Sequence, residues 1–210
     1  MSFCAALALA AVVLMVAGTG TGGIQTALLW TARLAFLLFW PAYAGGALAS
    51  LFGQAFRPVQ RRARELGLAF AAALSMHLGL VAWLCLIGAA PPVKTFVVFG
   101  IAVLCVYLLA LFSVGRLQRL LGSRTGWWLL RTAGMNYVAF AFALDFLRHP
   151  LAGGLLHAVF YGPFAALAIA GPAFRLAAGV RRAAGGPTIR ADVSGRLSGG
   201  AGQGGAPGAA

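Results

Sequence analysis

Residues 66–88 form a continuous apolar stretch with no charged side chain, and this stretch limits the fold more than any other part of the sequence. An α-helix rises ~1.5 Å per residue and the hydrocarbon core of a bilayer is ~30 Å thick, so about twenty apolar residues are enough to cross it. We therefore expect a membrane-spanning helix here. His77 lies near its centre, where an ionisable side chain is costly and usually has a functional or structural partner.

The composition excludes a water-soluble globular protein. Of 210 residues, 61% are hydrophobic and 9% are charged, which leaves too little polar surface to cover a soluble fold. The net charge of +13 comes from basic residues between apolar stretches, which is typical of topology signals and contacts with anionic lipid. The predicted partner is the lipid bilayer, and no nucleic acid is expected.

The hydropathy pattern predicts an all-α, polytopic membrane helical bundle of six transmembrane helices. The predicted spans are residues 3–18, 34–56, 66–88, 95–114, 127–147 and 155–176. Residues 18–23 are glycine-rich and are expected to form a loop, because glycine has low helix propensity. Residues 179–210 have few apolar anchors and are expected to be a disordered Gly/Ala/Arg-rich cytoplasmic tail. The first span lacks a basic n-region and is interpreted as a retained helix, with cleavage after Ala17 as the alternative.

The basic residues predict the orientation of the bundle. When the loops are assigned alternately to two sides, 13 of the 16 Lys and Arg residues fall on one side and Arg33, Lys94 and Arg148 fall on the other. By the positive-inside rule, both termini are then cytoplasmic. The expected location is the inner membrane of a bacterial-type cell.

His77 has two interpretations. Ala69 and Ala73 share its helix face, so this face could admit a flat cofactor or pack closely against another helix. Asn136 on the fifth span is predicted to lie within ~3 Å of the depth of His77, and Thr132 precedes it by one turn. We therefore predict a hydrogen bond between His77 and Asn136.

A second polar group is expected at the outer ends of the fifth and sixth spans. It consists of Asp145, Arg148, His149 and His157. Asp145 is three and four residues from Arg148 and His149, a spacing that suits an ion pair on a helix. The group is interpreted as a polar cap at the membrane surface, with proton relay or metal binding as the alternative.

Two stretches, RRARELGLAFAAALSMHLGLV at residues 61–81 and LLRTAGMNYVAFAFALDFL at residues 129–147, together resemble the ferric reductase-like transmembrane superfamily. Members of this family hold b-type haem between paired histidines, and the resemblance would make His77 one ligand. The positions thirteen and fourteen residues before it are Ala63 and Arg64, so the paired-histidine pattern is missing. The resemblance thus implies the helical scaffold and an accessory or degenerate redox role, with electrons from a separate partner subunit.

Residues 148–154, RHPLAGG, resemble the RHPxYxG signature of membrane methyltransferases that use S-adenosylmethionine, although Ala152 replaces the tyrosine. A methyltransferase-like enzyme is therefore one functional alternative. A non-catalytic membrane subunit or small transporter is the other. The sequence does not decide whether the chain is an enzyme.

Overall fold

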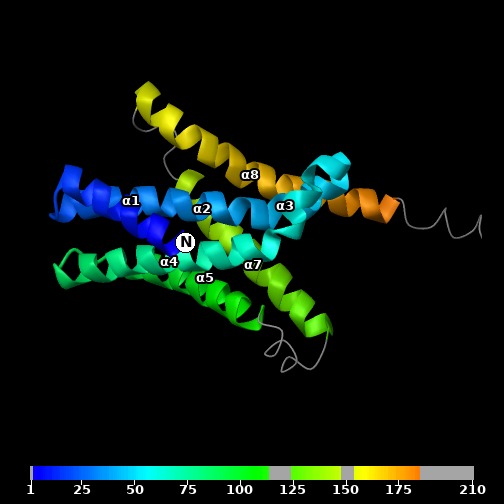
Figure 1. Cartoon of the computed structure of the whole chain (residues 1–210), viewed down its shortest axis with the longest axis horizontal. Helices are drawn as coiled ribbons and strands as arrows, with labels where there is room; N and C mark the ends of the chain where they lie inside the picture. Colours follow the sequence, from blue (N-terminus) through cyan, green and yellow to red (C-terminus); the bar gives the residue numbers. More distant parts are fainter. Residues whose placement is uncertain (1, 114–123, 148–153, 185–210) are drawn as a thin grey trace, which may run out of the picture.

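The structure is a computed structural model that describes residues 2–113, 124–147 and 154–184, and this part of the chain is helical apart from short turns. The helices are α1 (Ser2–Ala17), α2 (Thr21–Phe52), the 3-10 helix η1 (Gly53–Phe56), α3 (Arg57–Arg61), α4 (Ala63–Leu86), α5 (Val93–Phe112), α7 (Arg124–Leu147) and α8 (Gly154–Ala184). Figure 1 shows an elongated bundle in which most of the long helices run roughly side by side and α7 passes obliquely. The prediction of an all-α bundle is confirmed for the described residues.

The second long helix begins much earlier than the sequence predicts. We expected it to start near residue 34 after a glycine loop, but α2 starts at Thr21 and the turn is limited to residues 18–20. Gly18 adopts a φ of +82°, and a Cβ atom on Gly23 would collide with the Gly18 carbonyl group. Glycine is retained here because the α1–α2 turn brings two backbones together, and this outweighs its low helix propensity.

Helix α2 is the centre of the bundle. It packs against α1, α4 and α8 along its length, and α3 folds back onto its end (Figure 1). Gly45 permits this return, since a Cβ atom there would lie 3.0 Å from Cγ1 of Val59. The basic residues after α2, which we expected in a loop, therefore include a short helix.

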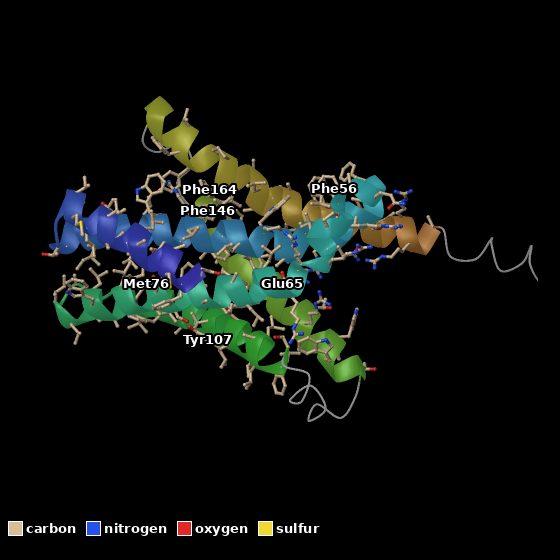
Figure 2. The ribbon with its side chains drawn as sticks, viewed as in Figure 1. Phe56, Glu65, Met76, Tyr107, Phe146 and Phe164 are labelled. Atoms are coloured by element: carbon tan, nitrogen blue, oxygen red, sulfur yellow. The ribbon has the colours of Figure 1, made fainter. Side chains whose placement is uncertain are left out.

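Six phenylalanine rings from four helices form the middle of the core. They are Phe36 and Phe39 of α2, Phe70 of α4, Phe142 and Phe146 of α7, and Phe164 of α8. Neighbouring rings lie with their centroids 4.9 to 6.1 Å apart, within the range of favourable aromatic contacts. Figure 2 labels two of them, Phe146 and Phe164, where α7 and α8 approach α2.

Four helical segments in the described part of the chain are long and apolar enough to cross a membrane. They are Thr21–Arg61, Ala63–Leu86, Val93–Phe112 and Ala158–Ala184. This supports an integral membrane protein. Helix α1 has 16 residues, about 24 Å of helix, and is shorter than a ~30 Å hydrocarbon core. Six spans with both termini cytoplasmic therefore remain a prediction.

The basic side chains collect at one end of the bundle. Figure 2 shows nitrogen-bearing side chains around α3, the start of α4 and the last turns of α8. The arginines in these segments are Arg57, Arg61, Arg62, Arg64, Arg181 and Arg182. Arg181 also ties α8 to α2, because its Nη1 donates to the carbonyl oxygens of Ser50 and Leu51 at 3.2 and 3.1 Å. We call this the basic end, and the end with the α1–α2 turn the far end.

Candidate functional site

A cavity of about 670 Å³ lies between α2, α4, α5 and α7 in the half of the bundle toward the far end. Most of its wall is apolar. Its polar side chains are Arg33, His77, Thr95, Asp145 and Tyr161. Ligand sites in proteins commonly combine about 300–1,000 Å³ of apolar space with a few convergent polar groups, and this cavity has both properties.

Arg33 lies far from the position that the sequence predicts for it. We assigned it to the start of a span at the membrane surface, whereas it lies twelve residues into α2 and is only 4% exposed. Its depth follows from His77, which is eleven residues, or about 16 Å, beyond Leu66 in α4. Thr31 contacts His77 and is two residues from Arg33 on α2, so the arginine lies level with the middle of α4.

Aromatic rings surround the guanidinium group of Arg33. Its Cζ atom lies 4.8 Å from the ring centroid of Tyr161, 5.1 Å from that of Trp30 and 5.3 Å from that of Phe164. Such contacts stabilise a cation by up to about 2 kcal/mol when water is excluded. Within the described part of the chain, the buried Nε atom of Arg33 has no hydrogen-bond partner. The arginine is thus held in place at its faces while one of its donors remains unused.

Asp145 and Tyr161 complete the polar side of the cavity. Both line it. Asp145 is exposed and lies two residues before the end of α7, so its place in a polar cap at the membrane surface stays a prediction. Arg148 and His149, its predicted partners, lie outside the described residues, as does most of the RHPLAGG segment. His157 belongs to α8, but its side chain is outside the described part.

His77 hydrogen-bonds a residue that the sequence analysis did not consider. Its Nδ1 atom lies 2.9 Å from the hydroxyl of Thr31, and that hydroxyl donates its proton to the Ala27 carbonyl oxygen at 2.8 Å. The predicted bond from His77 to Asn136 is therefore wrong. Thr31 was missed because the second span was predicted to begin near residue 34, whereas α2 begins at Thr21.

Asn136 has its own partner on α2. Its Oδ1 atom accepts a hydrogen bond from the hydroxyl of Tyr43 at 2.9 Å, and Arg175 of α8 lies over the Tyr43 ring at 4.5 Å. Thr132 lies one turn before Asn136 on α7. None of these four residues lines either cavity.

A second, smaller cavity of about 330 Å³ lies between α4, α5 and α7 toward the basic end. Arg64 of α4 and Arg131 of α7 line it, together with apolar residues of α5. Both arginines are exposed. In this part of the structure, the cavity wall carries positive charge and no acidic side chain.

Comparison with protein families, with characterised proteins and with solved structures finds no match to this chain. The functional conclusions therefore rest on its own residues. Among the described residues, no three His, Cys, Asp or Glu side chains lie together as a metal site would require. The sequence pattern identified His77 and Asp145 but not Arg33. It placed the start of the second span near residue 34, whereas α2 begins at Thr21.

Proposed function

We propose that this protein is a non-catalytic membrane subunit that binds a single-tailed anionic amphiphile in the larger cavity, with the head group at Arg33. The observation that carries the proposal is a buried arginine that lines a largely apolar cavity. A buried cation in such surroundings is costly, and an anionic head group in the cavity would offset this cost through a charged hydrogen bond with the guanidinium group.

The apolar walls of the cavity suit the hydrocarbon tail of such a ligand. Apolar residues of α4 and α5, including Leu74, Val81 and Val103, cover most of the space beyond the polar groups. A hydrocarbon tail would fit this surface, while a carboxylate or phosphate oxygen would meet the guanidinium group. Asp145 lines the same cavity and would disfavour a second anionic group there.

The basic end supports an orientation for the bundle. We place it at the cytoplasmic face of a bacterial-type inner membrane, because basic residues concentrate on the cytoplasmic side of such proteins. The larger cavity then lies in the outer half of the bilayer.

Filling the cavity should block binding. We expect Gly100→Leu to weaken binding of lysophosphatidylglycerol about five- to hundredfold, because Gly100 lines the cavity and the added side chain occupies ligand space at a cost of about 1–3 kcal/mol. The measurement is the concentration-dependent rise in thermal stability of the purified protein in a non-ionic detergent.

Gly79→Leu is the matched control. Gly79 is a helical glycine of α4 with open space around its Cβ position, like Gly100, but it does not line the cavity. Wild-type affinity is expected in this variant. If both leucine variants bind the lipid as wild type does, or if wild type is not stabilised by it, the binding site proposed here is wrong.

A redox role is the second candidate, and His77 is the observation that favours it. Its imidazole lines the cavity and is oriented by Thr31 through Nδ1, the kind of contact that prepares Nε2 for a metal. Among the described side chains, however, no second histidine lines the cavity, so the residues do not fit a haem held by paired histidines.

The optical spectrum decides this candidate. A b-type haem would give a Soret band in the purified protein, and His77→Ala would remove it. A correctly folded, colourless protein that gives no haem in a pyridine assay would exclude this role. The same sample serves as the starting material for the lipid-binding measurement.

A further inference from the structure

The two cavities share part of their walls. Phe70 of α4, Val106 of α5 and Val138 of α7 line both of them. The larger cavity continues from these three residues toward the far end, where Pro91 and Thr95 line it. The smaller one continues toward the basic end, where Arg64 and Trp127 line it. The cavities therefore lie one after the other along the bundle.

The three shared residues separate the cavities. Phe70, Val106 and Val138 are 4%, 5% and 2% exposed, so little free space surrounds their side chains. Each comes from a different helix. A small relative movement of α5 would change the width of this constriction, and α5 packs more extensively against α7 than against α4.

Positive charge lines each cavity at its polar side. Arg33 occupies this position in the larger cavity, and Arg64 and Arg131 occupy it in the smaller one. An anionic head group would find a favourable partner on either side of the apolar constriction. A tail could remain along α5, whose residues Val97, Ile101 and Leu104 are 55%, 44% and 59% exposed.

We infer that the two cavities are the halves of one pathway by which the head group of a single-tailed anionic amphiphile crosses the bilayer, with Phe70, Val106 and Val138 as the barrier between them. This inference rests on the binding function proposed above and adds movement to it. It assigns the smaller cavity as a second site for the same class of head group.

The test uses the full-length protein in phosphatidylcholine vesicles. Lysophosphatidylglycerol with a fluorophore on its acyl chain is added to the outside, and dithionite then destroys the fluorescence that remains in the outer leaflet. The protected fraction reports movement to the inner leaflet. We expect wild-type protein to accelerate this movement over protein-free vesicles, and to favour the anionic probe over lysophosphatidylcholine.

Opposite substitutions at Val106 test the barrier. Val106→Phe should slow the movement about five- to hundredfold, because it adds volume to a closed constriction, and Val106→Ala should accelerate it. Val180→Phe and Val180→Ala on α8 are matched controls, since Val180 is exposed and lines neither cavity. Replacing both Arg64 and Arg131 by glutamine should slow the anionic probe about fivefold per arginine.

The outcomes separate the two proposals. Binding to the detergent-solubilised protein without any acceleration in vesicles would overturn the pathway and leave the binding site standing. Equal effects of the Val106 and Val180 pairs would also overturn the pathway. If lysophosphatidylglycerol does not raise the thermal stability of the wild-type protein, the binding function itself is overturned. Circular dichroism and elution volume identify any variant that is misfolded, and Val106→Ala, which removes only two methyl groups, then carries the test.

Discussion

Replacing Arg33 by methionine is expected to weaken the binding of lysophosphatidylglycerol at least about thirtyfold. Truncating one partner of a buried charged hydrogen bond costs about 2–5 kcal/mol, and the guanidinium group of Arg33 is the cavity-lining cation that we assign to the head group. Arg33→Lys should recover part of the affinity, because lysine keeps the charge but lacks the planar set of donors.

The stability of the same variant should change much less. Methionine would lose the contacts of the cation with Trp30, Tyr161 and Phe164, worth up to about 2 kcal/mol. It would also remove the unsatisfied Nε donor, which costs about 1–3 kcal/mol in the ligand-free protein. These two effects oppose each other, so we expect the free energy of unfolding to change by no more than about 2 kcal/mol.

Arg175→Met provides the control for this experiment. Arg175 also lies over an aromatic ring, that of Tyr43, but it lines neither cavity. Affinity should therefore be unchanged in this variant. If Arg33→Met binds the lipid with wild-type affinity, Arg33 is not the head-group contact. A variant that fails to fold while Arg33→Lys folds but binds normally would make the arginine a structural cation only.

Hydropathy located the long helices because their length and apolar composition are visible in a single sequence. The span expected at residues 66–88 corresponds to α4 (Ala63–Leu86), and the one at 95–114 corresponds to α5 (Val93–Phe112). The start of α2 was missed by thirteen residues. Glycine has low helix propensity, and at Gly23 the reason for its presence is a backbone contact with Ala17 and Gly18 that only the folded chain shows.

The error in the start of α2 also explains why only part of the candidate site was predicted from the sequence. His77 was identified because it interrupts an apolar span. Its actual partner, Thr31, and the nearby Arg33 both precede the span predicted at residues 34–56, so no partner for His77 was sought among them. Depth arithmetic then selected Asn136, which is bonded to Tyr43 instead. A cavity also depends on how five helices pack together, and no local pattern in the sequence reports this.

The α1–α2 turn gives the second large expected effect. A Cβ atom on Gly23 would lie 2.7 Å from the carbonyl carbon of Gly18 and 2.9 Å from the carbonyl oxygen of Ala17. These are backbone atoms that cannot rotate away, so Gly23→Ala must open the turn. We expect a loss of about 3 kcal/mol, at the upper end of overpacking costs, and a fall of about 6–12 °C in the Tm of the detergent-solubilised protein.

Gly22→Ala shows whether this loss comes from the contact or from alanine itself. Gly22 is the neighbouring residue in the first turn of α2, and a Cβ atom there would meet nothing within 4 Å. Its variant should be as stable as wild type or slightly more stable, because alanine has higher helix propensity than glycine. Equal Tm values for the two variants would mean that the chain does not make the tight α1–α2 turn. A selective loss in Gly23→Ala would instead support the early start of α2, which is the feature that places Arg33 and Thr31 inside the membrane.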